Sequence, residues 1–265
     1  MTLRVAQLTD IHLTAKTGSE LYGVDTAQSL QKIVDVIKRL ADKPDVVIAT
    51  GDLAEDGAEA TYIRLRALLE TLGIPVYVLP GNHDDISVMR SVLASDGFHC
   101  TNTMTMQGWG FVFVNSQLEG YSHGYIGPDE LIELEKNINA LPDYPILVTL
   151  HHTPSKVCPS FGCQLENAKE FTELLNRHSN IKGVIAGHTH NACEIDAGGH
   201  TQFTTPSTFA KATHAQAGES VDHDDFWACH SLDGSLQGFR ILDLLPDGMI
   251  NSEVHWLNRE NCLSP

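Results

Sequence analysis

A short apolar run ends in two histidines at Val184-Ile185-Ala186-Gly187-His188-Thr189-His190. Four other places in the chain repeat this pattern, in which a strand-like apolar run is followed at once by metal-ligand residues. They are residues 4–8 before Asp10 and His12, 46–50 before Gly51-Asp52, 76–80 before Gly81-Asn82-His83-Asp84, and 146–150 before His151-His152. Six of the 14 histidines therefore follow predicted strands, accompanied by Asp and Asn. The repetition indicates a two-metal site.

The spacing within each motif predicts how the ligands converge. Asp10 and His12 are two positions apart, as are His188 and His190, so in an extended chain both side chains of a pair point to the same side. Gly51 precedes a ligand at a strand end, where a missing Cβ lets the backbone approach a bound ion closely. Because open α/β sheets place their sites at the carboxyl ends of strands, we expect the site on one rim of the sheets.

The elements between the motifs predict an α/β fold. A helical period of 3.6 marks residues 26–41, 58–72, 86–95, 130–141 and 167–178. A β-hairpin is expected at 103–106 and 111–114 around Gln107-Gly108-Trp109-Gly110, and further strands at 201–204, 239–244 and 250–255, the last two joined by Pro246-Asp247-Gly248. We predict a four-layer α/β/β/α sandwich of two mixed sheets with helices on the outer faces.

Length and charge limit the classes of protein and partner. At 265 residues we expect one domain over 1–265, with the motifs in 4–190 and C-terminal strands with substrate or oligomer loops in 191–265. The formal net charge of −17, without basic clusters, argues against long nucleic acid but not against a small anion. No apolar run reaches a membrane span, and Met1-Thr2-Leu3-Arg4-Val5 enters a strand directly, so we expect no membrane segment, no secretion leader and a cytoplasmic protein.

The six cysteines show no metal-binding or redox spacing. They are Cys100, Cys158, Cys163, Cys193, Cys229 and Cys262. No pair is two residues apart, and in a chain expected to be cytoplasmic we predict free, buried thiols rather than a disulfide between Cys158 and Cys163.

The ordered motifs resemble the calcineurin-like metallophosphoesterase family over residues 4–190. Mixed carboxylate and imidazole ligands with one amide oxygen suit Fe, Mn or Zn better than Ca or Mg alone. By resemblance, one ion is held by Asp10, His12, Asp52 and His190, and the second by Asp52, Asn82, His151 and His188, so that Asp52 bridges them. Two divalent or trivalent ions are implied, with Fe or Mn favoured and Zn or Co as alternatives.

The same resemblance implies a hydrolytic mechanism and a role for each remaining motif residue. A hydroxide between ions about 3.5–4 Å apart would attack phosphorus in line, without a protein nucleophile. The resemblance implies that His83 is the acid that protonates the departing alkoxide and that Asp84 is the carboxylate that orients the His83 imidazole. It also implies that Asn82, His83 and His190 bind the substrate. His152 is interpreted as a neighbour of the ligands rather than a ligand.

The substrate is less narrowly defined than the metals. The stretches at 51–57, 76–85, 205–208 and 238–243 resemble the class III cyclic-nucleotide phosphodiesterase branch, which implies hydrolysis of 3′,5′-cyclic AMP to 5′-AMP. Glycerophosphodiesters or other small nucleotides are the alternative substrates, and a scaffold without catalysis is the alternative of another class. Residues 209–237 depart from the branch by a longer stretch rich in His and Asp, which could line the pocket, form a homo-oligomer contact or be a solvated loop.

Four further histidines and one carboxylate stand outside these assignments. His123, His214, His223 and His230 lie outside the motifs and are expected to be ordinary loop histidines. Asp56, four residues after Asp52, is expected to cap the helix that begins near Ala58 rather than to bind metal.

Overall fold

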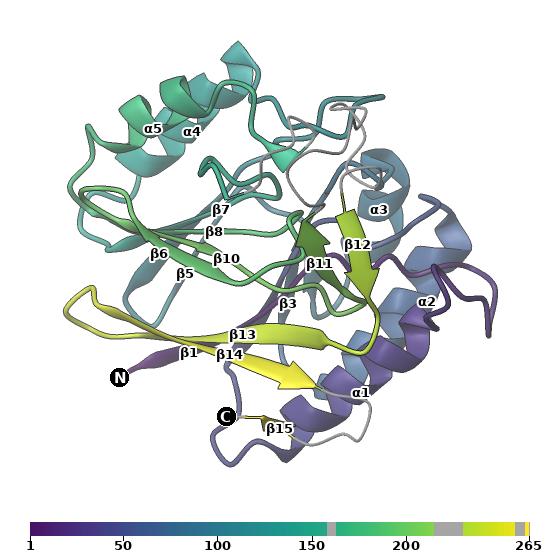
Figure 1. Cartoon of the computed structure of the whole chain (residues 1–265). Helices are drawn as coiled ribbons and strands as arrows, with labels where there is room; N and C mark the ends of the chain where they lie inside the picture. Colours follow the sequence, from purple (N-terminus) through teal and green to yellow (C-terminus); the bar gives the residue numbers. More distant parts are fainter. Residues whose placement is uncertain (158–162, 215–229, 258–262, 265) are drawn as a thin grey trace.

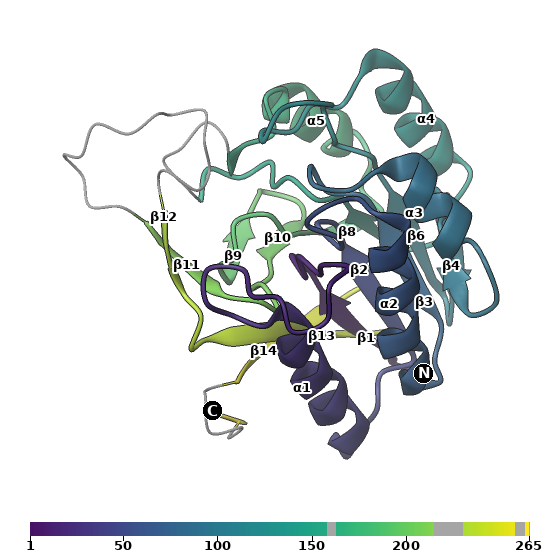
Figure 2. The ribbon, with the colours of Figure 1, turned by 90° about the vertical axis from the view of Figure 1, so that its right-hand side faces the viewer.

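Two β-sheets pack face to face in this computed structural model, which describes residues 1–157, 163–214, 230–257 and 263–264 (Figure 1). The first sheet has seven strands, in the order β15 (Leu263–Ser264), β14 (Ile250–Leu257), β13 (Gln237–Leu244), β1 (Leu3–Leu8), β2 (Val46–Thr50), β3 (Val76–Leu79) and β4 (Phe98–His99). The second has six, in the order β5 (Thr103–Met106), β6 (Trp109–Phe113), β7 (Ile146–Thr149), β8 (Ile181–Ala186), β10 (Thr201–Thr204) and β9 (Cys193–Asp196). A separate pair joins β11 (Lys211–His214) to β12 (His230–Asp233), and Figure 2 shows it at the margin of the two sheets.

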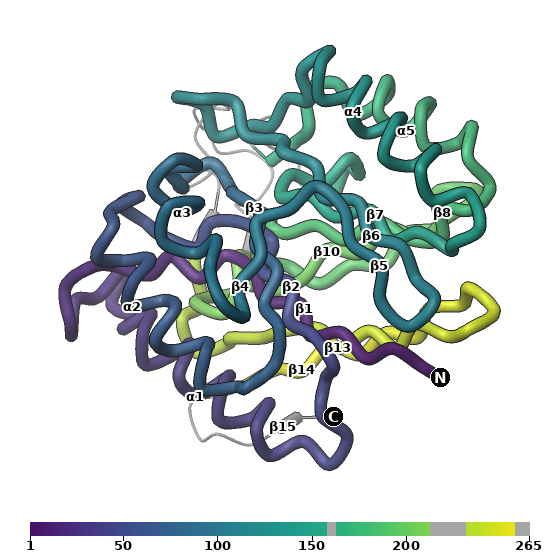
Figure 3. The backbone as a smooth tube through the Cα atoms, turned by 180° about the vertical axis from the view of Figure 1, so that it is seen from behind, coloured from purple at the N-terminus to yellow at the C-terminus, as the bar shows by residue number. Residues whose placement is uncertain are grey.

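Helices cover the outer face of each sheet. On the first sheet lie α1 (Thr26–Arg39), α2 (Glu59–Leu69) with the 3₁₀ turn η1 (Glu70–Leu72), and α3 (Ile86–Leu93), and on the second lie α4 (Pro128–Asn139) and α5 (Ala168–Leu175) (Figure 3). Three apolar clusters fill the spaces between these four layers. The cluster between the two sheets includes the buried Trp109, Phe111 and Leu147. The predicted α/β/β/α sandwich is confirmed.

Most predicted elements are found close to their expected bounds. The hairpin is antiparallel, but its turn is only Gln107-Gly108, because Trp109 already pairs with Met106 as a strand residue. The helix expected at 58–72 ends earlier as an α-helix, at Leu69, and finishes in η1. Among the described residues no helix is both long and apolar enough to cross a membrane.

One cysteine differs from the sequence-based expectation. Cys163 is disulfide-bonded, so the prediction of free thiols is wrong at this position. Cys100 and Cys193 are free. Cys158, Cys229 and Cys262 lie outside the described residues.

The order of strands brings the motifs to one rim. β1, β2 and β3 are parallel neighbours, as are β7 and β8, so the carboxyl ends within each set meet at one edge. Backbone hydrogen bonds continue beyond the strands: the Asp10 N–H donates to the Gly51 carbonyl at 3.1 Å, and the Gly187 N–H donates to the His151 carbonyl at 2.9 Å. The segments that follow the strands are therefore held side by side, with their ligand residues facing one region.

Candidate metal centre

Asp10, His12 and His190 form the first cluster of possible ligands, and all three side chains are buried. The Nε2 atoms of His12 and His190 are 3.3 Å apart, and His190 Nε2 is 3.5 Å from Asp10 Oδ1. Ligand atoms about 2.1 Å from one ion, at tetrahedral or octahedral angles, lie about 3.0–3.4 Å from each other. The spacing is therefore close to that of ligands around one ion, which we call the first site.

A second cluster of possible ligands is formed by Asp10, Asp52, His151 and His188. Its member Asp52 also lies close to the first cluster. Its Oδ2 atom is 3.6 Å from His12 Nε2 and 3.2 Å from His151 Nε2. Its other oxygen, Oδ1, accepts a hydrogen bond from the His83 backbone N–H at 2.9 Å. One carboxylate oxygen thus faces both clusters while the other is fixed to the backbone, which is the arrangement that a bridging ligand requires.

Two buried polar atoms near Asp52 make no hydrogen bond with any described residue, and both fit a metal at the second site. They are Asn82 Oδ1 and His151 Nε2. The Nδ1 atom of His151 lies 2.8 Å from the Thr50 carbonyl, to which it donates, so Nε2 is the ring atom that would bind a cation in place of a proton. Because an unpaired buried polar atom is costly, these two atoms are best explained as ligands, and their oxygen and nitrogen donors suit Fe, Mn or Zn.

Five of the seven proposed ligands have a left-handed backbone conformation. Asp10, His12, Asp52, His188 and His190 have φ values of 51°, 47°, 49°, 67° and 53°. Residues other than glycine rarely adopt this conformation, which costs about 1–2 kcal/mol for each. Several residues in this left-handed conformation at one rim of the sheets are typical of a functional site. The packing is also tight, because a Cβ atom at Gly81 would lie 2.2 Å from Asp52 Oδ1.

The charges of the cluster favour ionised carboxylates. Burial alone would raise the pKa of Asp52, but the charges of His151 and His83 hold that pKa well below its usual value. Burial opposes the charged form of His151, yet Asp52 and Asp10 raise the pKa of its imidazole to about 9, so a metal that binds at Nε2 must displace the proton on that atom. The carboxylates therefore remain in the ionised form, which is the form that binds metal.

His83 is surrounded by negative charge. Burial lowers the pKa of His83, but the negative charges of Asp52 and Glu55 outweigh it, and the pKa lies above the ordinary value of histidine. His83 Nδ1 lies 3.3 Å from Glu55 Oε2, and the same oxygen lies 2.7 Å from His12 Nδ1. The sequence interpretation did not include Glu55, although an acid three positions after Asp52 was an available signal.

The Asp84 carboxylate is bound mainly by the protein backbone, while its charge helps to raise the pKa of the neighbouring His83. Its two carboxylate oxygens accept hydrogen bonds from the N–H groups of Gly81, Leu53 and Ala54 and from the Tyr62 hydroxyl, at 2.8–3.1 Å. Glu55 contacts the His83 ring at Nδ1. Asp84 is thus a buried support beneath the loop that carries Asn82 and His83.

His152 lies near His151 and His188, with which it forms a third group that could hold a metal, but its ring nitrogens have partners within the protein. Its Nε2 atom is 3.1 Å from the Ser122 carbonyl and its Nδ1 atom is 2.9 Å from the Ser116 hydroxyl, so both ring nitrogens are engaged. A Cβ atom at Gly124 would lie 2.4 Å from the His152 ring. His152 therefore anchors the segment at 116–124, which lines one wall of the cleft described below.

The remaining residues of the sequence interpretation are structural or lie outside the description. Asp56 accepts hydrogen bonds from the Ala58 N–H and the Thr61 hydroxyl near the start of α2, but the N-cap residue is Ala58 and no side chain caps this helix, so the capping prediction is wrong. His123 is buried 3.4 Å from Glu166. Of residues 209–237, the structure describes 209–214 and 230–237, and the side chains of His214, His223 and His230 are outside it.

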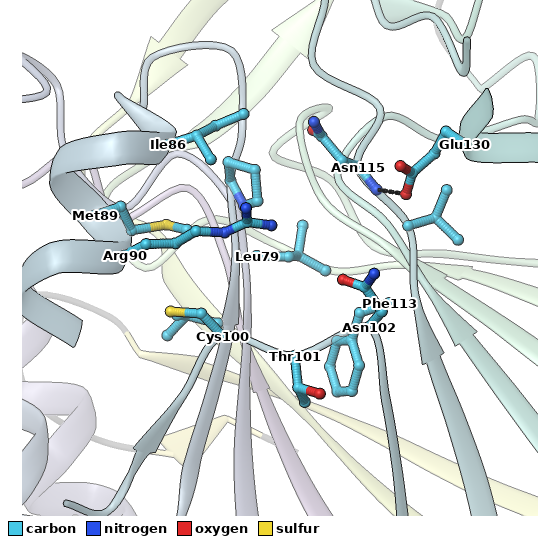
Figure 4. A pocket seen from close by; sticks show the side chains of 13 residues that line it. Leu79, Ile86, Met89, Arg90, Cys100, Thr101, Asn102, Phe113, Asn115 and Glu130 are labelled. Atoms are coloured by element: carbon cyan, nitrogen blue, oxygen red, sulfur yellow. Dashed lines mark hydrogen bonds between the residues drawn. The ribbon is translucent and has the colours of Figure 1, made fainter. Parts of the chain in front are cut away.

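Two cavities flank the loop that carries Asn82 and His83. A cleft of about 570 Å³ is lined by Asn82, His83, Gln117 and Glu119, among other residues. A second cavity, of about 240 Å³, is lined by Ile86, Met89 and Arg90 of α3 and also by Asn115 and Glu130 (Figure 4). The second cavity contains none of the predicted site residues, so the first is the candidate for substrate.

The sequence is similar to that of known phosphoesterases. Residues 3–192 match the model of the calcineurin-like phosphoesterase family. A 3′,5′-cyclic adenosine monophosphate phosphodiesterase of Escherichia coli (strain K12) is 31% identical over 258 residues, which cover 96% of this chain and 90% of the relative. A 3′,5′-cyclic-nucleotide phosphodiesterase of Nostoc sp. is 28% identical over 255 residues, which cover 95% and 91%.

Solved structures show the same fold at low identity. A dimetal phosphatase from Danio rerio superposes with a TM-score of 0.61 at 14% identity, covering 97% of this chain and 98% of that one. A protein of Thermus thermophilus gives a TM-score of 0.60 at 14% identity, covering 96% and 99%.

Proposed function

Because the chain belongs to the calcineurin-like phosphoesterase family, we propose that it is a two-metal phosphodiesterase that hydrolyses 3′,5′-cyclic AMP to 5′-AMP. Family membership and the cyclic-nucleotide phosphodiesterases that it resembles along most of their length make the chain a metal-dependent phosphodiester hydrolase. The observation that supports the proposal best is Asp52 Oδ2, which faces His12 of one cluster and His151 of the other.

In the proposed centre, Asp10, His12, Asp52 and His190 hold one ion, and Asp52, Asn82, His151 and His188 hold the other. Ions bound there would supply Lewis acidity toward the phosphoryl oxygens and an activated water. We propose iron or manganese, since the donor set mixes carboxylate, imidazole and amide, with zinc and cobalt as alternatives.

The chain's own residues complete the chemistry. His83 lines the cleft and is proposed to donate the proton to the leaving alkoxide, while Glu55 keeps the ring turned through its contact with Nδ1. Asn82 and His83, with His190 on the other side of the centre, are proposed to contact the phosphate. Asp84 supports this loop from beneath through its hydrogen bond from the Gly81 N–H.

The cleft favours a substrate whose only negative charge is the diester itself. Its described lining includes the carboxylates of Asp56, Asp85 and Glu119 and no lysine or arginine. A second anionic group would therefore be repelled, whereas a nucleoside or a glycerol group would meet hydrogen-bonding side chains. Cyclic AMP and glycerophosphodiesters both satisfy this condition, and glycerophosphodiesters are the second candidate substrates. We further propose a single-domain protein that acts in the cytoplasm.

The test is a metal and substrate survey of the purified protein. We expect two ions per chain, loss of activity with a chelator, and its return with Mn²⁺ or Fe²⁺. The panel is cyclic AMP, cyclic GMP, a glycerophosphodiester and bis-p-nitrophenyl phosphate. Activity that survives the chelator, or no activity after metal is restored, would contradict the two-metal proposal, and a glycerophosphodiester turned over faster than cyclic AMP would change the substrate.

A further inference from the structure

Ser207 to Ala210 form a fully buried segment that lies against the first metal site; we call residues 207–210 the clasp segment. It follows β10 and runs directly into β11, beyond the part of the chain that matches the family model. All four residues are completely shielded from solvent. The Thr208 N–H donates to the Thr9 carbonyl at 3.1 Å, which fixes the segment beside the end of β1.

The Ser207 hydroxyl links two ligands of the first site. It donates to the Asp10 carbonyl at 2.7 Å and accepts from the N–H groups of Phe209 at 2.9 Å and Ala210 at 3.2 Å. The Ala210 carbonyl, fixed in this way, lies 3.0 Å from His190 Nδ1 and accepts a hydrogen bond from it. One hydroxyl thus holds the backbone of Asp10 and, through Ala210, the orientation and tautomer of the His190 ring.

The Phe209 ring packs against the two imidazoles of the same site. Its centroid is 5.7 Å from that of His12, at 62°, and 6.1 Å from that of His190, at 82°, both edge-to-face arrangements. The ring excludes water from this side of the ligands and limits their rotation. The second site is held from elsewhere, because the Thr50 carbonyl at the end of β2 accepts from His151 Nδ1.

We propose that the clasp segment sets the affinity of the first metal site separately from that of the second. The inference rests on the proposed two-metal function and deepens it: Ser207 and Phe209 become positioning residues for one ion of the pair. Loss of a group that hydrogen-bonds to a metal ligand typically changes metal affinity by about 10- to 100-fold. Occupancy of the two sites should therefore separate when the clasp is altered.

The test measures metal binding rather than activity. Wild-type protein, Ser207→Ala, Ser207→Thr and Phe209→Leu are titrated with Mn²⁺ against a competing chelator, and bound metal is counted by mass spectrometry. The control is Ser116→Ala, which removes another buried serine hydroxyl, one that contacts His152. For Ser207→Ala we expect one ion bound as in wild type and the other bound roughly 10- to 100-fold more weakly. Phe209→Leu should weaken the same ion, and Ser207→Thr, which keeps a hydroxyl, should recover part of the affinity.

Three outcomes would overturn the proposal. If Ser207→Ala weakens the binding of both ions equally, or of neither, the clasp has no selective role. If Ser116→Ala weakens the binding of one ion in the same way, the loss is a general effect of removing a buried serine hydroxyl. If Ser207→Ala does not fold, Phe209→Leu alone decides in the same way. A wild-type protein that holds fewer than two ions would overturn the two-metal function itself, which separates that failure from failure of the clasp.

Discussion

Replacing His83 by alanine should separate substrates by their leaving groups. The ring lies 3.3 Å from Glu55 and lines the cleft beside Asn82, where it can protonate a departing alkoxide. A positioned general acid contributes about 10²–10⁴-fold, or roughly 2.7–5.4 kcal/mol of activation free energy. We expect kcat/KM for cyclic AMP to fall by this factor. Bis-p-nitrophenyl phosphate should lose less than about tenfold, since an aryl oxide departs without a proton.

The structure also predicts that this variant keeps its metals. The contact between residue 83 and Asp52 is made by the backbone N–H, at 2.9 Å, and alanine retains it. Steady-state kinetics on both substrates, with metal content measured on the same samples, therefore isolate the proton transfer. Equal losses for the alkyl and aryl substrates at full metal content would refute the assignment of His83 as the acid.

Three further predictions concern other residues. Glu55→Gln should weaken metal binding at the first site by roughly 10- to 100-fold, because an amide supports the His12 ring less well than the carboxylate that lies 2.7 Å from Nδ1. The affinity is measured by competition titration, and an unchanged value would show that Glu55 does not support this ligand. The pKa of His200 is lowered by burial, so its neutral form, which accepts from Gln202 Nε2 at 3.2 Å, stabilises the fold above about pH 6.5 and loses this effect as pH falls. Urea unfolding at pH 7 and pH 5 should show a drop in unfolding free energy that is smaller in His200→Asn than in wild type, and an equal drop in both proteins would count against it. Gly124→Ala should lower the unfolding free energy by about 1–3 kcal/mol, since its Cβ would meet the His152 ring at 2.4 Å, and a thermal shift near zero would show that the ring yields.

The sequence predicted which of the proposed ligand side chains lie close together, because they sit at strand ends. Parallel strands of two packed sheets end on one rim, so position along the chain was enough to bring Asp10, Asp52 and His151 together. The layers of the sandwich followed from the same alternation of strands and helices.

Roles that depend on orientation were harder to predict. Asp84 is adjacent to His83 in sequence, yet its carboxylate turns toward the backbone of Leu53 and Ala54, and Glu55 reaches the ring from another loop. The contact of Ser207 with Asp10 spans 197 positions of the chain, and no local pattern encodes it. The disulfide at Cys163 was missed because the expected cytoplasmic location argued against disulfides in this chain.

The left-handed backbone at five ligands makes the centre easier to lose than to gain. Each ligand position must satisfy two demands, a donor atom and a positive φ, and few side chains meet both. Asparagine and glycine adopt this conformation more readily than other residues, so a replacement such as Asp52→Asn relaxes the backbone while it removes a charge from the bridge. Descendants of this chain that no longer need catalysis should drift toward Asn and Gly at these positions. A designer who builds such a centre into a new scaffold must shape the turns first, since grafting the seven side chains onto ordinary strand ends would misdirect them.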